Sequence, residues 1–350
     1  MSAMVAEGLE RRGPGDIDTV RASIEAMNAF YNETTGLWDS SPWWHSGVAL
    51  RVIAEYMLIT GSDEYLDMAV HTVNTQRAPL PWWPEGGGDF RADSTDDTGW
   101  WALALASLYE VTGNATYLDL ARADAAYMAQ YWNTTTCGGG LIWNIPLRTY
   151  HNAISNELYL ELTATLHGLI PGDTYYLGEA LREWEWFNAS GMINGAGLVN
   201  DGLTDDAACV NNGYPIWTYN QGVVLAGLAR LAAATGDAGY IRTARTIADA
   251  VIADPGLSPG GVLTEQACAA ADECEPNGTA FKGIFARGLA RLDAALADRP
   301  YRGYIQRNAR SAYDTARNGS DFYGFRWQGP FDTGTIGRQA SAADLLLSTL

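Results

Sequence analysis

Apolar residues alternate along the chain between two helical patterns. Segments that are apolar nearly all round are followed each time by amphipathic ones, such as 238–252. A helix with apolar residues on every side is buried, whereas an amphipathic helix exposes one face to solvent. The segments that are apolar nearly all round are 47–60, 98–111, 153–168, 218–235 and 280–296. The pattern therefore predicts repeated pairs of one inner and one outer helix.

A short turn separates the two helices of each pair. Most of these turns contain Thr-Gly or Pro-Gly, and an aromatic-led helix begins a few residues later. Glycine favours the left-handed conformation that ends many helices. The turns are Thr60-Gly61, Thr112-Gly113, Pro171-Gly172 and Thr235-Gly236, with a weaker copy from Asp298 to Tyr301. They recur about every 50 to 65 residues, which suits one helical hairpin and a loop.

The two ends of the chain supply a sixth pair. The predicted helix at 16–31 has no inner partner before it, and the predicted helix at 337–350 has no outer partner after it. Together they close a ring. We therefore predict an all-α fold, an (α/α)6 barrel or six-hairpin toroid, in which residues 1–350 form a single domain. An open solenoid is the alternative.

The long loops all precede an inner helix. They are rich in Gly, Trp and Asn, and they cover residues 79–97, 133–152, 189–217 and 254–279. Long loops tend to carry function, whereas short turns set geometry. A binding cleft is therefore expected at the N-terminal ends of the inner helices.

Two adjacent carboxylates, Asp96 and Asp97, open one inner helix, with two tryptophans directly behind them. Retaining hydrolysis of a glycosidic bond needs two carboxyl groups about 5 Å apart, one to attack the anomeric carbon and one to protonate the leaving oxygen. Neighbouring side chains on a helix lie roughly 100° apart, so they can share a site and point differently. Helix capping is the competing interpretation, although Ser94 and Thr95 already offer a cap.

Polar and aromatic side chains open the other inner helices or the loops before them. A ring of amide, hydroxyl and carboxylate groups with aromatic platforms suits a polyhydroxylated ligand. Capping of helices by Asn152 and Asn220 and core packing of Trp217 are the competing interpretations. The candidate ligand-binding residues are Trp101, Asn152, Asn156, Asp201, Trp217, Tyr219, Asn220, Gln221 and Lys282.

The net charge of the chain limits the kinds of partner that it can bind. The 350 residues carry a formal net charge of −19. No basic patch is available to displace counterions from nucleic acid or to bind an anionic membrane. We therefore expect neither partner, and we expect a monomer. Because Asp-rich stretches such as 201–206 lack EF-hand spacing and no H-E-x-x-H occurs, neither a metal nor another cofactor is expected.

The cysteines favour two disulfides. Cys137, Cys209, Cys268 and Cys274 form an even set without a C-x-x-C pair, and three pairings are possible. Cys268 and Cys274 bracket a short loop, so pairing them leaves Cys137 with Cys209 in the long loops. We favour this arrangement over four free thiols.

Six Asn-X-Ser/Thr sequons indicate a secreted glycoprotein. Residues 1–16 lack the apolar middle of a signal peptide, and no stretch approaches the roughly 20 apolar residues of a membrane span. The sequons begin at Asn32, Asn114, Asn133, Asn188, Asn277 and Asn318.

Several strings in a fixed order give the chain a resemblance to a known family. They are Asp96 to Trp101, Cys137 to Gly140, Asn152 to Asn156, Asn200 to Gly202, Trp217 to Gly222 and Phe281 to Phe285. The ordered set resembles glycoside hydrolase family 76, the endo-α-1,6-mannanases and their fungal cell-wall relatives, from about Ser23 to Ala343.

This resemblance implies an (α/α)6 barrel and retaining hydrolysis of α-1,6-mannan backbones, with Asp96 as nucleophile and Asp97 as acid/base. The implied partner is α-1,6-linked mannan or its oligosaccharides. GPI-anchored members end in a hydrophobic tail, which is not found up to Leu350, so wall anchoring is not expected. A transglycosidase acting on mannose-containing cell-wall or GPI glycans and a non-catalytic glycan-binding barrel are the alternatives.

The proposed roles require different protonation states for the two aspartates. Asp96 must be charged to attack, while Asp97 must carry a proton. A helix N-terminus favours ionisation of both. The charge of Asp96 and desolvation by Trp100, Trp101 or a bound sugar oppose that for Asp97. A raised pKa is therefore expected for Asp97.

Overall fold

The computed structural model describes residues 13–39, 41–269 and 274–350. Most of the segment considered for a signal peptide, and four residues of the loop at 254–279, lie outside these ranges.

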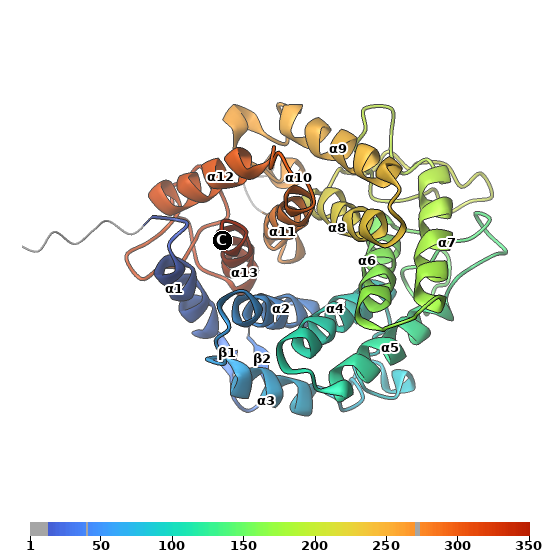
Figure 1. Cartoon of the computed structure of the whole chain (residues 1–350), viewed down its shortest axis with the longest axis horizontal. Coiled ribbons are helices and arrows are strands. Elements are labelled where there is room, and N and C mark those ends of the chain that lie inside the picture. Colours follow the sequence, from blue (N-terminus) through green and yellow to red (C-terminus); the bar gives the residue numbers. More distant parts are fainter. Residues whose placement is uncertain (1–12, 40, 270–273) are drawn as a thin grey trace, which may run out of the picture.

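Two concentric layers of helices make up the fold (Figure 1). The inner helices are α2 (Trp43–Thr60), α4 (Thr95–Thr112), α6 (Ala153–Leu169), α8 (Thr218–Thr235), α11 (Phe281–Ala294) and α13 (Ile336–Leu347). The outer helices are α1 (Ile17–Asn28), α3 (Leu66–Gln76), α5 (Ala115–Ala129), α7 (Tyr175–Ala189), α9 (Ala238–Ala253) and α12 (Arg302–Thr315). Shorter elements are the antiparallel pair β1 (Tyr31–Asn32) and β2 (Leu37–Trp38), helix α10 (Gln266–Ala269), and the 3-10 turns η1 (Pro84–Gly86), η2 (Pro259–Gly261) and η3 (Asn277–Thr279).

The inner helices form a closed ring. Each contacts the next in the order α2, α4, α6, α8, α11, α13, and α13 contacts α2 again. In the outer layer, α1 packs on α13, which is the sixth pair formed by the two chain ends. The predicted (α/α)6 barrel is therefore confirmed, and the open solenoid is excluded.

Burial explains the two hydrophobic patterns. Every residue of α4 from Thr98 to Leu108 is buried, because inner helices contact neighbours on both sides and the outer layer behind. In α9 only Ala244, Ile247, Ala248 and Val251 are buried, the spacing of a single helical face. Inner helices also approach closely: a Cβ atom on Gly288 of α11 would lie 2.0 Å from the carbonyl oxygen of Gly222 in α8.

Glycine ends three inner helices as predicted. Gly61, Gly113 and Gly236 are the C-caps of α2, α4 and α8, with left-handed φ angles of 70°, 65° and 74°. The prediction is wrong for the Pro-Gly turn. Helix α6 ends on Ile170 in an extended conformation, and Gly172 takes its φ of 76° two residues later.

In five of the six inner helices, the fourth residue has a polar side chain that is hydrogen-bonded to the loop before the helix. We call this residue the clamp, and the loops before the inner helices the rim loops. Each clamp accepts a hydrogen bond from a backbone N–H of the preceding long segment. In the order clamp and loop residue, the bonds are Ser46 with Trp38 (3.0 Å), Thr98 with Ala92 (3.0 Å), Asn156 with Leu141 (2.7 Å), Gln221 with Val199 (2.8 Å) and Gln339 with Tyr323 (2.9 Å). The loops are therefore fixed to the barrel at an equivalent position each time.

Two disulfides staple the rim, in the favoured pairing. Cys137 bonds Cys209 with a Cα–Cα distance of 5.3 Å, which joins the loops before α6 and α8. Cys268 bonds Cys274 with a Cα–Cα distance of 4.8 Å.

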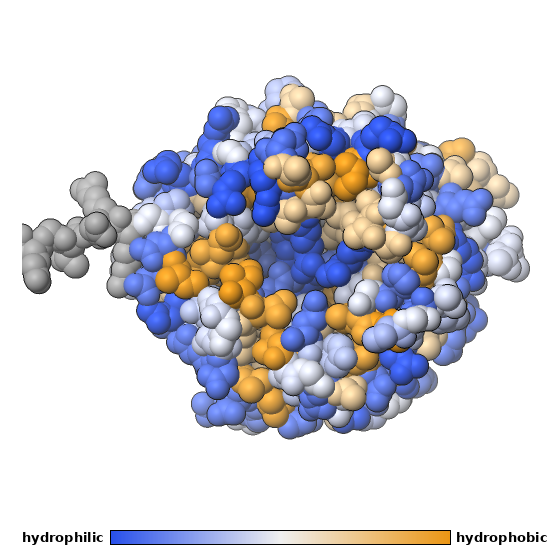
Figure 2. All heavy atoms as spheres, in the orientation of Figure 1, coloured by the Kyte–Doolittle hydropathy of each residue, from blue (hydrophilic) through white to orange (hydrophobic). Residues whose placement is uncertain are grey.

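The opposite end of the barrel holds buried ion pairs around a cavity of about 300 Å³. Arg51 reaches Glu161 at 2.5 Å and Glu55 at 2.8 Å, and Arg287 pairs with Asp344 at 3.0 Å. A space-filling view shows a hydrophilic hollow over the centre of the ring (Figure 2).

Candidate active site

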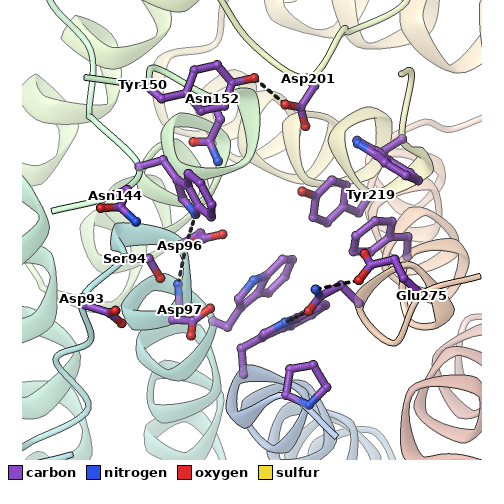
Figure 3. A pocket seen from close by; sticks show the side chains of 17 residues that line it. Asp93, Ser94, Asp96, Asp97, Asn144, Tyr150, Asn152, Asp201, Tyr219 and Glu275 are labelled. Carbon is purple, nitrogen blue, oxygen red and sulfur yellow. Dashed lines mark hydrogen bonds between the residues drawn. The ribbon is translucent and has the colours of Figure 1, made fainter. Parts of the chain in front are cut away.

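A cavity of about 400 Å³ lies at the N-terminal ends of the inner helices, where the cleft was expected (Figure 3). Its walls come from four inner helices, α2, α4, α8 and α11, and from segments that precede these helices and α6. Its lining residues are Pro42, Trp44, Asp93, Ser94, Asp96, Asp97, Trp100, Trp143, Asn144, Tyr150, Asn152, Asp201, Trp217, Tyr219, Glu275, Asn277 and Phe281.

A loop backbone caps helix α4, so its aspartates do not have to. The Thr95 N–H donates to the Trp143 carbonyl oxygen at 3.0 Å, and the Thr95 hydroxyl donates to the Ile142 carbonyl oxygen at 2.8 Å. The Ser94 side chain makes no capping bond, contrary to our expectation. The Asp96 carboxylate accepts a hydrogen bond from the backbone N–H of the adjacent Asp97, at 3.0 Å. The geometry therefore removes the main argument for capping as the reason for two aspartates.

The two aspartates have unequal surroundings, although both are half-buried. Burial raises the pKa of Asp96 to about 6, and hydrogen bonds from Ser94, from backbone N–H groups and from the Trp143 indole hold it from rising further. Burial also raises the pKa of Asp97 well above its usual range, and the charges of Asp96 and Asp93 raise it more. Among the residues that the structure describes, no hydrogen-bond donor lowers the pKa of Asp97. The pair therefore favours a charged Asp96 beside a protonated Asp97, as expected.

Stacked aromatic rings form one side of the cavity. Tyr219 stacks on Phe281 with centroids 3.8 Å apart, Trp44 stacks on Trp100 at 5.3 Å, and Trp100 lies 6.4 Å from Tyr219. The interplanar angles of these pairs are 20° to 24°. Faces of this kind bind the C–H-rich sides of sugar rings through burial of apolar area.

A carboxylate on another wall is held by a tyrosine. The Tyr150 hydroxyl donates to Asp201, as the dashed line in Figure 3 marks, and accepts from the Asn212 side chain at 2.8 Å. Burial raises the pKa of Asp201, while bonds from Tyr150 and the Trp217 indole oppose the rise. The Tyr150 hydroxyl therefore holds the Asp201 carboxylate in place on the cavity wall.

The remaining wall comes from the segment before α11. Asn277 accepts from the Trp44 indole at 2.8 Å and donates to Glu275 at 3.1 Å. Glu275 adds a carboxylate to Asp93, Asp96, Asp97 and Asp201, and no Lys or Arg lines the cavity among the residues that the structure describes. An anionic ligand would find no counter-charge there.

Six of the predicted site residues line this cavity. They are Asp96, Asp97, Asn152, Asp201, Trp217 and Tyr219. Asn152 also caps α6, since its side chain accepts the Ser155 N–H at 3.3 Å. Capping and a place in the cavity are thus compatible for this residue.

Two predicted ligand-binding amides are clamps instead. Asn156 is fully buried, accepts the Leu141 N–H and donates to the carbonyl oxygens of Leu141 and Asn152. Gln221, also fully buried, bonds the N–H and the carbonyl oxygen of Val199. Their hydrogen-bonding groups serve the loops and do not face the cavity.

Three further predicted residues lie away from the cavity. Trp101 is buried 4.9 Å from both the Trp43 and Phe90 ring centroids, within the core. Asn220 is fully buried inside the barrel. The Lys282 ammonium donates to the Phe325 carbonyl oxygen and lies 4.5 Å from the Trp327 ring centroid, and burial lowers its pKa to about 7. None of these three residues is among the described residues that line the cavity.

Several residues that line the cavity were not predicted from the sequence. Trp143, Asn144 and Tyr150 lie in an irregular loop, where no periodicity indicates which side chains face inward. Asn277 was interpreted only as a sequon, yet its amide is bonded inside the cavity. Its position beside Phe281, at a predicted helix start, was the available signal.

Within the described ranges, none of the helices combines the length and the apolar character needed to cross a bilayer.

A helical barrel whose cleft holds two adjacent aspartates beside aromatic faces is typical of glycoside hydrolases. The chain belongs to glycosyl hydrolase family 76, whose profile matches residues 19–350.

Named relatives and solved structures agree with this assignment. Mannan endo-1,6-alpha-mannosidase DFG5 of Saccharomyces cerevisiae is 28% identical over 344 residues, which cover 91% of this chain and 73% of the yeast protein. The GH76A alpha-1,6-mannanase from Salegentibacter sp. HEL1_6 superposes with a TM-score of 0.84 at 22% identity, covering 95% of this chain and 98% of that one. An inactive variant of that mannanase, with two consecutive aspartates replaced by asparagine, is in complex with alpha-1,6-mannotriose and matches with the same TM-score and coverage at 21% identity.

Proposed function

We propose that this chain is a retaining, endo-acting α-1,6-mannanase formed by one catalytic domain. The observation that carries the proposal is the pair of adjacent aspartates on the cavity wall. Asp96 accepts hydrogen bonds from several donors, whereas within the described residues no hydrogen bond lowers the pKa of Asp97. Such a pair supplies the charged nucleophile and the protonated acid of a retaining glycosidase.

In the first half-reaction, an Asp96 carboxylate oxygen attacks the anomeric carbon of a mannose unit. A new C–O bond forms to Asp96 as the bond from that carbon to the leaving glycosidic oxygen breaks. The Asp97 proton passes to the leaving oxygen, which departs as the hydroxyl of the shortened chain. The product is a glycosyl ester on Asp96, with Asp97 ionised.

In the second half-reaction, Asp97 accepts a proton from water. The water oxygen bonds to the anomeric carbon, and the ester bond to Asp96 breaks. Formation of the ester had removed the Asp96 charge, which lowers the pKa of Asp97 and suits it to act as a base. Both carboxyl groups then return to their initial protonation states.

A neutral polysaccharide fits the cavity better than an anionic one. Five carboxyl groups and no Lys or Arg line the described part of it. Sugar hydroxyls donate charge-assisted hydrogen bonds to carboxylates such as Asp201 and bring no charge of their own to desolvate. The names of the yeast and bacterial relatives support α-1,6-linked mannan as that polysaccharide.

Incubation with linear α-1,6-mannan tests the activity. We expect internal cleavage to short oligosaccharides, with retained anomeric configuration by NMR. Asp96→Asn and Asp97→Asn should each lower turnover by at least about 10²-fold without loss of fold. Wild-type activity in either variant would remove that aspartate from the mechanism. Growth of products upon addition of an acceptor sugar, with little hydrolysis, would support the transglycosidase alternative.

Calorimetric titration of the Asp96→Asn variant with mannotetraose tests the ligand class. Affinity should depend weakly on ionic strength, since neither partner needs an ion pair. A steep salt dependence, or a preference for a uronic-acid oligomer, would contradict the mannanase assignment. We also propose that the protein is monomeric and acts outside the cell, which its disulfides support.

A further inference from the structure

Trp143 contacts the proposed nucleophile directly. Its indole Nε1–H donates to Asp96 Oδ1 at 3.0 Å, and the Asp97 backbone N–H donates to the same oxygen at 3.0 Å. The reaction proposed above has no stated role for Trp143. Resting on that reaction, we infer that Trp143 is a positioning residue, whose indole N–H orients the Asp96 carboxylate and keeps it ionised for attack.

The backbone around Trp143 is fixed on both sides. The Trp143 N–H donates to the Tyr150 carbonyl oxygen at 2.7 Å, and the Trp143 carbonyl oxygen accepts the Thr95 N–H at 3.0 Å. The Ile145 N–H donates to the Asp93 carbonyl oxygen at 2.9 Å. The loop therefore docks on the first turn of α4, and the indole is delivered to Asp96 by the same segment that caps the helix.

Burial opposes the ionisation of Asp96, and further carboxyl groups lie around it. Asp97 follows it on α4, Asp93 precedes the helix, and the loops before α8 and α11 bring Asp201 and Glu275 to the same cavity. The titratable hydroxyls on these walls are those of Tyr150 and, from α8, Tyr219. No Lys or Arg of the described chain lines the cavity. Neutral hydrogen-bond donors must therefore stabilise the charged Asp96 carboxylate in place of a cation.

This donor distinguishes the two aspartates. Asp96 accepts the indole N–H, whereas no side chain in the described part of the protein donates a hydrogen bond to Asp97. A hydrogen bond to the charged form lowers a pKa, so removal of the indole N–H raises the pKa of Asp96. The acid limb of kcat/KM then moves to higher pH, because Asp96 attacks only when ionised.

Two substitutions separate the N–H from the ring face. Trp143→Phe and Trp143→Leu both remove the donor, and only Phe keeps an aromatic face on the cavity. We expect both variants to shift the acid limb upward by about one pH unit and to lower kcat by about tenfold. Only Trp143→Leu should also raise KM. Trp82→Phe is the matched control, since Trp82 is 51% exposed and lies outside the cavity lining.

A titration that needs no substrate keeps this test independent of the proposed function. The ¹³C carboxyl resonance of Asp96, assigned by its loss in Asp96→Asn, reports the pKa directly in each variant. An upward shift in Trp143→Phe and Trp143→Leu supports the inference even if α-1,6-mannan is not the substrate. Unchanged Asp96 titration and an unchanged acid limb, with only a higher KM, would make Trp143 a sugar platform and overturn the inference. Absence of mannanase activity in the wild type alone would instead refute the proposed function.

Discussion

Replacement of the Asn156 clamp by leucine tests how the site is held. Leucine is close to asparagine in shape, so little cavity is created, but three hydrogen bonds disappear. The Asn156 side chain accepts the Leu141 N–H at 2.7 Å and donates to the carbonyl oxygens of Leu141 at 3.1 Å and Asn152 at 2.7 Å. The Leu141 N–H then stays buried without a partner, because Leu141 is fully buried.

The expected loss in free energy of unfolding is about 3 kcal/mol, from the unpaired N–H and the lost bonds together. Unfolding entropy of about 2.1 cal/mol/K per residue converts this to a fall in Tm of about 4 °C for a chain of 350 residues. Calorimetry measures the change. Hydrogen exchange should rise at residues 139–145, the segment that the clamp holds.

The substitution should also affect kinetics, because Leu141 lies only two residues before Trp143 in the same loop. Loosening of this segment weakens the indole bond to Asp96, so kcat should fall more than KM rises. Gln221→Leu is the matched control, because it removes the equivalent clamp from α8 and should raise exchange near Val199 instead. A higher KM with unchanged Tm and unchanged exchange at 139–145 would show that Asn156 binds substrate, and the clamp argument would be refuted.

Three further outcomes are expected. A plot of kcat/KM against pH should be bell-shaped. It should fall below about pH 6 as Asp96 is protonated and fall again at higher pH as Asp97 loses its proton. A flat profile across the acid range would contradict the assigned roles. Tyr150→Phe should weaken mannotetraose binding about tenfold by calorimetry, because a carboxylate on the cavity wall loses a charge-assisted bond. Replacement of Cys137 and Cys209 by serine should lower the free energy of unfolding by about 4 kcal/mol, because the disulfide closes a loop with a sequence separation of 72. Hydrogen exchange should become faster only in the rim loops. Faster exchange throughout the barrel would argue against a local effect of the disulfide.

The barrel could be predicted because an inner helix is buried on all sides. That environment makes segments such as 98–108 apolar on nearly every side, while an outer helix such as α9 keeps one buried face. Glycine marked the turns wherever the helix ended in a left-handed residue. The end of α6 differed because Ile170 leaves the helix in an extended conformation, which the Pro-Gly step did not indicate.

The site was predicted where it coincides with helix starts. Asp96, Asp97 and Tyr219 are found by their place in the repeat, since the inner helices converge at one end. Trp143 and Tyr150 could not be found in this way, because an irregular loop has no periodicity that tells inward from outward side chains. Asn156 was predicted to bind a ligand, whereas its side chain bonds to loop backbone. A buried amide that bonds to backbone and one that binds a sugar look alike in sequence.

The inner helix that completes the ring is the last one to be synthesised. Until α13 emerges, α2 and α11 each lack one of their two inner-layer neighbours, and α1 lacks the helix on which it packs. The contacts between α13 and α2 join residues nearly 300 positions apart, so their loop-closure entropy must be overcome before they stabilise anything. Partly made chains therefore expose apolar helix surface throughout translation, and we expect production of this barrel to depend on chaperones more than its final stability would suggest.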